Sequence, residues 1–555
     1  MIKETIYREI KKILGDDARD FVVEKSSDFG DYATNAAMMN AKGRTGGPRE
    51  FAEFIISELW KSEEIKNVVE KMGVAGPGFI NFYLKDEVMR EHIGEILEKG
   101  GGYGTNKNEA GEKVIIEYTD PNPFKEFHIG HLMTNTLGEA LSRIIEANGA
   151  EVKRACYQGD VGMHVAKTVW AISKKQQEIR DASDLGKAYS YGAQNYEEFK
   201  DEIQTINKKI YDRSDEEINR IYDEGRKISL DYFEHIYKRL GTHFDYYFFE
   251  SETGVLGQKI VEENLNKVFF KSDGAVVFPG EEHGLHTRVF LNSEGLPTYE
   301  AKELGLAKIK HDTYPYDTSV IVTANEVNDY FQVLLRAMSL VFPELEKKTK
   351  HISHGMLRLP TGKMSSRTGD VITATSFLDA LSEMVMAKIA DRDIEDKGKV
   401  ADEVALAGIK YSILKQSPGK DIIFDPEKAL SFEGDSGAYL QYAYVRTQSI
   451  LRKSLPRSDL GKDFPRSDLG EPVSALEKML FEGLPNAVLM ARRELSPNYI
   501  ATYLIDLCRE FNTYYEQNQI LNNEHTEHRL ALVSAVGTVL KNGLTLLGIP
   551  IPEKM

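Results

Sequence analysis

Two histidines around a glycine, with a lysine just upstream, are the first side chains in this sequence whose spacing suggests chemistry. The stretch DPNPFKEFHIGH at residues 120–131 contains Lys125, His128, Gly130 and His131. Residues three apart at a helix start project from one side, beside unpaired backbone N–H groups and the positive end of the helix dipole. Imidazole N–H donors placed there can hold phosphate oxygens, and the glycine leaves room for a flat base on the backbone. Taken alone, the pattern also fits two ordinary surface histidines; a zinc site lacks a third ligand at suitable spacing.

A second chemically suggestive stretch, KMSSRTGD at 363–370, follows a strand-like run, HISHGMLRL at 351–359. Its polar side chains are Lys363, Ser365, Ser366 and Arg367. A phosphate-binding P-loop is excluded, because Met364 stands where that motif requires a serine or threonine. We expect a cationic loop that closes over a triphosphate and stabilises the charge that develops on a leaving pyrophosphate.

The elements around the first histidine predict an open α/β sheet. The apolar run KVIIEYT at 113–119 predicts a buried strand, residues 129–145 carry apolar side chains at helical spacing, and EVKRACYQ at 151–158 predicts the next strand. A βαβ unit of this kind puts the histidine loop at the carboxyl end of a parallel strand, where such sheets bind ligands. Further strands are expected at 287–291 and 318–324, and the chain should be wholly helical from about residue 426.

Length and composition indicate a soluble protein of several domains. The chain has 555 residues, of which 41% are hydrophobic and 28% charged, which predicts three or four domains. No tract is apolar enough to span a bilayer, and a net charge of −17 disfavours unspecific binding to nucleic acid. The two cysteines are far apart, and the first residues lack the features of a targeting signal, so we expect a cytoplasmic protein.

HIGH at a strand-to-helix junction, followed far downstream by KMSSR, resembles the class I aminoacyl-tRNA synthetases. The intervening segments are similar to those of the arginyl-tRNA synthetase family and occur in the same order. They are DPNPFKEFHIGH (120–131), YQGDVGMH (157–164), FES (249–251), TYEAKELGLAK (298–308), GMLRL with KMSSRTGD (355–370) and FDPEKALSFEGDSGAYLQYAYVR (424–446). FGDYATNAAM (29–38) and GPGFINFYL (76–84) resemble the additional N-terminal domain of that family. The resemblance covers nearly the whole chain.

The resemblance implies a Rossmann-like catalytic domain with two accessory domains. We expect an α+β tRNA-binding domain at 1–104, closed by a linker GGGYG, and a catalytic domain at 105–375 with a helical insertion at about 170–245. A connecting stem at 376–425 and an all-α anticodon-binding domain at 426–555 should follow.

The resemblance also assigns the catalytic and ATP-binding residues. Most class I enzymes have a second lysine in the KMSKS loop, but here Ser366 takes that position. In arginyl enzymes of this type a lysine just before HIGH is thought to compensate, and Lys125 matches it. Expected catalytic residues are Lys125, His128, His131, Lys363 and Arg367. Expected ATP-binding residues are Lys125, His128, Gly130, His131, Met356, Lys363, Ser365 and Ser366.

Arginine recognition should rest on carboxylates, which match the planar fork of a guanidinium. The residues implied by the resemblance are Asn122, Asp160, His164, Glu250, Tyr299, Glu303 and Glu326. Glu303 stands where the family pattern has aspartate, and Glu326 lies near where a glutamine is common. Both departures keep or add negative charge, so arginine is favoured over a neutral amino acid.

For tRNA, single-stranded loops are read by aromatic stacking and polar edge contacts. Phe79 and Asn81 are candidates for the elbow of the tRNA. Candidates in the helical region are Tyr439, Tyr442, Arg446, Asn498 and Tyr514. Tyr514 lies on an apolar helical stripe, where packing is the favoured alternative.

The implied partners are L-arginine, ATP with Mg²⁺ and tRNA(Arg), with no bound zinc, no membrane and a monomeric chain. Two rivals are left open: a catalytically silent paralogue that binds tRNA, which Ser366, Glu303 and Glu326 would favour, and another HIGH-type adenylate-forming enzyme. The long helical C-terminal region and the number of arginyl-like segments argue against the second.

Overall fold

The computed structural model describes residues 2–26, 29–42, 46–358, 372–454 and 473–555. The loop KMSSRTGD lies outside these ranges, and so do Lys363, Ser365, Ser366 and Arg367. The chain forms two compact units. One comprises residues 104–445, 487–502 and 543–555, and the other comprises 1–103, 446–486 and 503–542. Among the described helices, none is long and apolar enough to cross a membrane.

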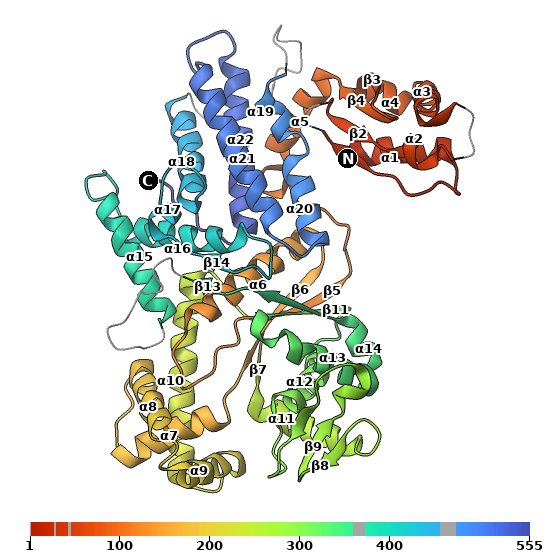
Figure 1. The fold of residues 1–555 in the computed structure, drawn as a ribbon. Helices are drawn as coiled ribbons and strands as arrows, with labels where there is room; N and C mark the ends of the chain where they lie inside the picture. The colour runs from red at the N-terminus through yellow and green to blue at the C-terminus, as the bar shows by residue number, and fades with distance from the viewer. Residues whose placement is uncertain (1, 27–28, 43–45, 359–371, 455–472) are drawn as a thin grey trace. The chain divides into compact units, whose positions relative to one another are not determined.

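A five-stranded, fully parallel sheet organises the first unit (Figure 1). Its strand order is β12-β11-β5-β6-β7. The strands are β5 (Lys113–Glu117), β6 (Glu151–Gln158), β7 (Tyr246–Phe249), β11 (Thr318–Ala324) and β12 (Thr349–His354). Val114, Ile115 and Ile116 of the central strand are fully buried, as expected for a sheet covered on both faces. The predicted α/β class and four of the predicted strands are confirmed.

The helix α6 (Ile129–Ala147) connects β5 to β6 and completes the predicted βαβ unit. Leu132, Leu141 and Ile144 are fully buried at helical spacing, so the stripe read from the sequence is the core face of the helix. The helix is followed by Gly149 in the left-handed region, at φ 98°. The histidine loop therefore lies at the carboxyl end of β5, as predicted.

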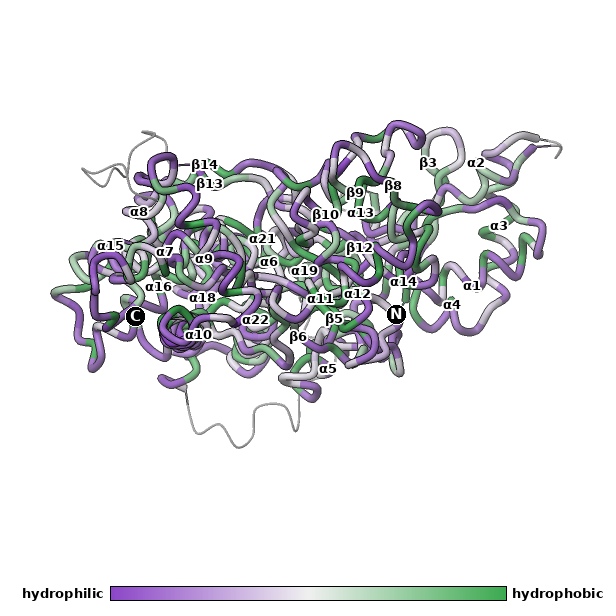
Figure 2. The backbone as a smooth tube through the Cα atoms, turned by 90° about the horizontal axis from the view of Figure 1, so that it is seen from below, coloured by the Kyte–Doolittle hydropathy of each residue, from purple (hydrophilic) through white to green (hydrophobic). Residues whose placement is uncertain are grey.

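Four helices form the insertion between β6 and β7. They are α7 (Met163–Lys175), α8 (Ala182–Gln194), α9 (Lys200–Asp212) and α10 (Glu216–Leu240). They share a core of their own that includes Val165, Trp170, Ile203 and Ile221. One face of α10, which includes Ile218, Ile221 and Phe233, is buried. Figure 2 colours the backbone by hydropathy and shows hydrophilic and hydrophobic stretches interspersed along the described chain.

A small antiparallel sheet follows β7, and it contains one of the predicted strands. The run TRVFL forms β10, but β10 pairs with β9 and lies outside the parallel sheet. The elements of this region are α11 (Glu250–Glu263), β8 (Phe270–Ser272), β9 (Ala275–Phe278), β10 (Arg288–Leu291), α12 (Tyr299–Thr313), α13 (Asn328–Val341) and α14 (Pro343–Lys348). The short strand β7, YYFF, was not predicted, because four aromatic residues without alternation carry little strand signal.

The remaining chain is helical as expected, apart from a short two-stranded ladder. The ladder pairs β13 (Leu357–Arg358) with β14 (Ile422–Ile423). The helices are α15 (Ala374–Lys388), α16 (Lys397–Leu414), α17 (Pro426–Ala429), α18 (Gly437–Lys453), α19 (Ala475–Leu480), α20 (Gly483–Arg493), α21 (Asn498–Gln517) and α22 (Thr526–Leu546).

The second unit contains an antiparallel sheet of order β1-β2-β4-β3, which confirms an α+β fold for the N-terminal residues. Its elements are α1 (Ile2–Leu14), β1 (Val23–Lys25), β2 (Tyr32–Thr34), α2 (Ala36–Asn40), α3 (Gly47–Leu59), α4 (Glu63–Val68), β3 (Val69–Ala75), β4 (Phe79–Leu84) and α5 (Asp86–Lys99). The GGGYG stretch is not the linker we expected. Tyr103 is buried, and the Asn542 side chain donates to the carbonyls of Gly100 and Tyr103 at 2.8 and 2.9 Å.

Candidate functional site

The two histidines cap the helix that they begin. His128 is the N-cap residue of α6, and its Nδ1 accepts a hydrogen bond from Gly130 N at 3.1 Å. His131 Nδ1 accepts from His128 N at 3.2 Å, so the pair forms a reciprocal capping box. The rings stack, with centroids 3.6 Å apart and planes inclined by 18°. The predicted projection of both rings from one side is confirmed.

This capping fixes the protonation of both rings. A ring nitrogen that accepts a backbone N–H bond carries no proton, so in each neutral imidazole the proton is on Nε2. Burial lowers the pKa of His128, and burial together with the neighbouring ring lowers the pKa of His131 further; the charge of Lys125 acts in the same direction on both. At neutral pH the motif therefore offers two uncharged Nε2–H donors, which suit phosphate oxygens.

Gly130 is required for a reason that differs from our expectation. A Cβ at this position would lie 2.9 Å from His128 Cε1 and 3.0 Å from His128 Nδ1. Glycine therefore lets the His128 ring fold back over the first turn of α6 and accept its N–H bond. The space above Gly130 holds the His128 ring, and a nucleotide base would have to lie elsewhere on the motif.

Lys125 presents an ammonium group beside the histidines. Its Nζ lies 4.8 Å from the ring centroid of Tyr189 in α8, a cation–π contact. Within the described ranges this ammonium has no hydrogen bond or ion pair, so it can meet an incoming anion. Its charge acts on His128, His131 and also His164, which places it among all three rings. Tyr189 carried no recognisable sequence signal.

The loop before the histidines has a strained backbone. Thr119, Asp120 and Phe124 have φ values of 82°, 46° and 68°, in the left-handed region that non-glycine residues rarely occupy. The strain is held by the surrounding structure: Asp120 Oδ1 accepts from Tyr157 N at 2.7 Å, and Phe124 N donates to Ser229 Oγ at 2.9 Å. Strain held in this way is typical of functional loops.

Both described ends of the KMSSR segment are anchored in this unit. Thr373 forms a β-bridge with His128, and Ala374 N donates to Phe127 O at 2.8 Å. On the other side, the half-buried Met356 donates from its backbone N to Asp421 Oδ1 at 2.9 Å. After the undescribed residues 359–371, the described chain therefore resumes directly beside the histidines.

A buried histidine links the strand before that loop to α6. His354 Nε2 lies 2.8 Å from Thr134 Oγ1, one turn beyond Gly130. Gly355 follows, and a Cβ there would lie 2.3 Å from the backbone of Lys420, which excludes any other residue. His354 was not among our sequence candidates, because its partner lies on an element that is remote in the chain.

Two of the residues expected to bind arginine approach each other at Gly159, just after β6. A Cβ there would lie 2.3 Å from Asn122 Oδ1 and 3.1 Å from Glu250 Oε1, so only glycine lets these two side chains approach. Asn122 follows β5 and Glu250 follows β7, so three neighbouring strands each contribute one residue. Glu250 is 4% exposed, and its Oε2 forms an ion pair with Lys302 Nζ at a distance of 2.5 Å. Lys302 was absent from our candidates.

Asp160 and His164 have partners within the protein. Asp160 is fully buried, and its two oxygens accept hydrogen bonds from Ser251, Tyr222 and Arg226 at 2.8 to 3.1 Å. The carboxylate holds the start of α11 against the insertion, and the assignment of Asp160 to arginine itself stays a prediction. His164 Nε2 donates to Gly159 O at 2.8 Å, and burial lowers its pKa to about 3, so it is neutral with Nδ1 as the remaining acceptor.

The remaining arginine candidates differ in their surroundings. Glu303 on α12 is half-buried and makes no hydrogen bond or ion pair within the described chain. Burial, followed by the charge of Glu117, raises its pKa well above the ordinary value. Tyr299, one turn earlier, is 63% exposed. Glu326, at the carboxyl end of β11, is exposed to solvent.

The tRNA candidates divide by burial. Phe79 is 39% exposed on β4, whereas Asn81, on the same strand face, is only 6% exposed. No hydrogen bond of the Asn81 amide to another described residue is present, so the amide is a recessed polar group. Tyr439 is 9% exposed on the buried side of α18, so little of its ring is available for base stacking, and its assignment to tRNA stays a prediction. Tyr442 is half-buried, with its ring 6.4 Å from that of Phe432.

The last three tRNA candidates also have neighbours. The Arg446 guanidinium donates to Asn512 Oδ1 at 2.5 Å and lies 5.6 Å from the centroid of the Tyr515 ring. Asn498 accepts from Ser496 Oγ at 2.5 Å. The stripe on α21 is core as far as Phe511, but Tyr514 is half-buried and lines a hollow of about 430 Å³ with Arg90 and Asn518, so packing does not fully account for it.

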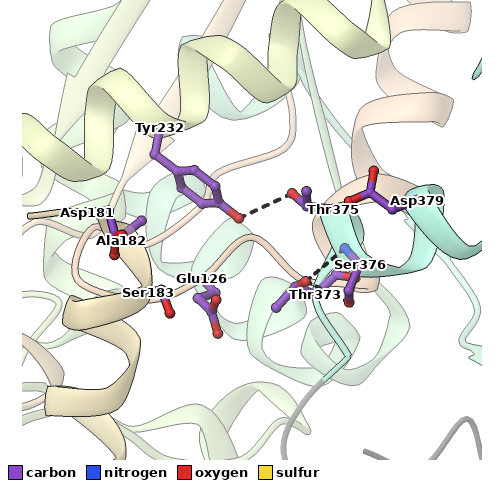
Figure 3. A pocket seen from close by; sticks show the side chains of 9 residues that line it. All are labelled: Glu126, Asp181, Ala182, Ser183, Tyr232, Thr373, Thr375, Ser376 and Asp379. Atoms are coloured by element: carbon purple, nitrogen blue, oxygen red, sulfur yellow. Dashed lines mark hydrogen bonds between the residues drawn. The ribbon is translucent and has the colours of Figure 1, made fainter. Parts of the chain in front are cut away.

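A second hollow, of about 340 Å³, lies beside the histidine loop (Figure 3). It is lined by Glu126, Asp181, Ala182, Ser183, Tyr232, Thr373, Thr375, Ser376 and Asp379. Tyr232 and Thr375 approach each other across it, with their hydroxyl oxygens 3.4 Å apart. Its described lining holds carboxylates and hydroxyls but no cation, so it does not fit a triphosphate.

Comparisons with known proteins agree with this geometry. The family model described as tRNA synthetases class I (R), catalytic domain, matches residues 92–426. The Arginyl tRNA synthetase N terminal domain model matches residues 1–84, and the DALR anticodon binding domain model matches 440–555.

Relatives match over the full length of the chain. The arginine–tRNA ligase of Fusobacterium nucleatum is 33% identical, across 97% of this chain and 95% of its own length. That of Clostridium acetobutylicum is 30% identical, across the full length of both chains. The solved arginyl-tRNA synthetase of Thermus thermophilus is 27% identical, with a TM-score of 0.82 over 100% of this chain and 99% of its own.

Replacing Lys125 by alanine tests the ammonium beside the histidines. Lys125→Ala should slow pyrophosphate release from ATP by about 2 to 4 kcal/mol in activation free energy, as loss of a charge-stabilising donor does. The measurement is arginine-dependent ATP–pyrophosphate exchange. Lys175→Ala is the matched control, because the Lys175 ammonium also lies over a tyrosine of α8, Tyr191, at 3.3 Å. Exchange by Lys125→Ala at the rate of the control would rule out this role.

The raised pKa of Glu303 gives arginine binding a pH dependence. A guanidinium binds the ionised carboxylate, so the arginine KM should fall as pH rises through the raised Glu303 pKa, by at most about tenfold per pH unit. The charged groups that act on the Glu303 carboxyl include Glu117, Lys310, Glu250 and Glu300, and Asp120 also interacts with it. Glu303→Gln should raise the KM and remove this slope. An unchanged slope in Glu303→Gln would assign the titration to another group.

Proposed function

The chain belongs to the arginyl-tRNA synthetase family of class I, and we propose that it joins L-arginine to the 3′-terminal adenosine of tRNA(Arg) at the expense of ATP. The observation that carries this proposal is the juxtaposition of two unlike subsites at adjoining strand ends. One presents uncharged N–H donors and an ammonium, as a triphosphate requires. The other presents a half-buried carboxylate without a partner in the described chain, as a guanidinium requires.

The triphosphate would lie against the first turn of α6. His128 and His131 would donate from Nε2 to phosphate oxygens, Gly130 shapes that turn, and Lys125 would approach from the insertion side. Lys363 and Arg367, with Ser365 and Ser366, would complete the site from the KMSSR loop, and Met356 would border the adenine. Donors held in place before the reaction favour the charge that develops on pyrophosphate.

Arginine would bind between the ends of β5, β7 and α12. Glu303 is the partner we assign to the guanidinium, since its carboxylate lacks one. Asn122 and Glu250 meet at Gly159 and would form hydrogen bonds with the other polar groups of the amino acid. Tyr299 would cover the aliphatic stem, His164 would offer Nδ1 as an acceptor, and Glu326 would act from the rim. Asp160 would hold the start of α11 in place and thereby position Glu250, the first residue of that helix.

The reaction needs no protein nucleophile. A carboxylate oxygen of arginine attacks the α-phosphorus of ATP, the bond to the bridging oxygen breaks, and pyrophosphate leaves. The 2′-hydroxyl of the terminal adenosine then attacks the activated carbonyl carbon, and AMP leaves. Side chains of this protein position the reactants and neutralise charge.

Mg²⁺ would accompany ATP and neutralise phosphate charge. Among the described residues, no group of three or more His, Cys, Asp or Glu side chains is arranged to hold a metal ion. The ion would therefore arrive on the triphosphate, with at most one or two protein ligands.

The tRNA would be held by both accessory regions. Phe79 is exposed for stacking, and the recessed amide of Asn81 beside it can reach a base edge or ribose. Tyr442, Arg446, Asn498 and Tyr514 would contact the anticodon side. Cys156 and Cys508 are both reduced and buried, which suits the cytoplasm, and we propose a monomer as the working unit.

The test is ATP–pyrophosphate exchange by the purified protein, with and without tRNA that accepts arginine, using lysine and citrulline as control amino acids. We expect exchange with arginine only, and only in the presence of tRNA. Exchange that depends on another amino acid would overturn the assignment of arginine. Intact binding of ATP and tRNA without any exchange would instead indicate a catalytically silent paralogue.

A further inference from the structure

A buried ion pair lies inside the proposed arginine subsite, and its two members come from different elements. Lys302 Nζ of α12 donates to Glu250 Oε2 of α11 at 2.5 Å. The two side chains are 6% and 5% exposed. Burial is the largest single influence and acts to lower the pKa of Lys302, but the Glu250 carboxylate and the Tyr211 hydroxyl together outweigh it, so the net shift is upward and the ammonium stays charged. Breaking a buried pair on one side is costly, because the other charge is left alone.

The pair occupies one oxygen of Glu250 and leaves the other for a ligand. Oε1 lies beside Gly159 and Asn122, at the point where these residues exclude any further side chain. No described residue donates a hydrogen bond to Oε1. A carboxylate anchored through one oxygen cannot rotate freely, so the second oxygen has a fixed direction.

Lys302 is itself held by neighbours on several sides. Its aliphatic stem passes Gly254, where a Cβ would lie 3.6 Å from Lys302 Cγ. Its ammonium lies 5.5 Å from the ring centroid of Tyr299 and also interacts with the Tyr211 hydroxyl of α9. An ammonium with this many contacts has a fixed position in the site.

We propose that Lys302 is a positioning residue for arginine recognition, which holds Glu250 so that Oε1 faces the substrate and sets the net charge of the subsite. When Glu303 is ionised, the two carboxylates of Glu250 and Glu303 and the ammonium of Lys302 carry one net negative charge, which matches the single net positive charge of free arginine. Without Lys302, a buried Glu250 would take up a proton and lose its strength as an acceptor. This proposal rests on the proposed function.

The experiment compares Lys302→Met, Lys302→Arg, Glu250→Gln and the double variant Lys302→Met/Glu250→Gln. Arginine KM, ATP KM and kcat are measured in aminoacylation, after the wild-type protein has been shown to charge arginine. Lys308→Met is the matched control, because Lys308 is on the same helix and makes only an exposed ion pair with Asp312. A wild-type protein that charges no arginine would overturn the proposed function. This first measurement therefore distinguishes failure of the proposed function from failure of the role proposed for Lys302.

If Lys302 acts through Glu250, Lys302→Met should raise the arginine KM on the order of 10- to 100-fold, which corresponds to loss of a hydrogen bond to a charged group. ATP KM should stay within about twofold, and Lys302→Arg should recover most of the arginine affinity. The double variant should resemble Glu250→Gln alone, because the two residues act as one unit. Effects of the two single changes that multiply in the double variant would overturn the proposal. So would a normal arginine KM in Lys302→Met, or equal losses for arginine and ATP, which would indicate a general structural role.

Discussion

The two hydrogen bonds that close the first turn of α6 are the contacts on which the rest of the site depends. His128 and His131 each accept a backbone N–H through Nδ1. Those bonds satisfy donors that a helix start otherwise leaves to water, and they also orient both rings and place the remaining proton on Nε2. One local interaction thus explains why the motif contains two histidines three apart, why glycine stands between them, and why the rings act as uncharged donors beside Lys125.

The parallel sheet determines what can join this turn. In the order β12-β11-β5-β6-β7, the chain moves from β5 toward β6 on one side, while β11 lies on the other, so α6 begins where the winding direction changes. Four of the five strand ends deliver a candidate residue: Asn122 after β5, Glu250 after β7, Glu326 after β11 and Met356 after β12. The donors that we assign to phosphate and the acids that we assign to the guanidinium are therefore neighbours because of topology, although they are far apart in the sequence.

The sequence predicts what short-range patterns determine. The βαβ unit, the histidine motif and the helical C-terminal region follow from periodicity and spacing, and they are confirmed in the described residues. Residues that acquire their contacts only through the tertiary fold could not be identified from short-range sequence patterns. Lys302, Tyr189 and His354 gain their roles from elements remote in the chain, and no local pattern distinguishes them from other residues of their type.

Burial explains the other differences between the sequence-based expectations and the structure. Asp160 and Tyr439 carry the polar or aromatic groups expected of contact residues, but one is saturated by internal donors and the other is packed within α18. The linker predicted from GGGYG failed for the same reason, because Asn542 fixes its carbonyls. Composition indicates what a side chain can bind, and only tertiary packing decides whether the group is still available.

The most direct test of this account is the protonation of the two capping histidines. Long-range ¹⁵N correlation spectra of the histidine-labelled protein, assigned with His128→Gln and His131→Gln, would report which ring nitrogen carries the proton. We predict Nε2–H tautomers for both rings at neutral pH, with protonation only well below the ordinary histidine pKa. Nδ1–H tautomers, or imidazolium rings at neutral pH, would contradict the capping arrangement and the anion site built upon it.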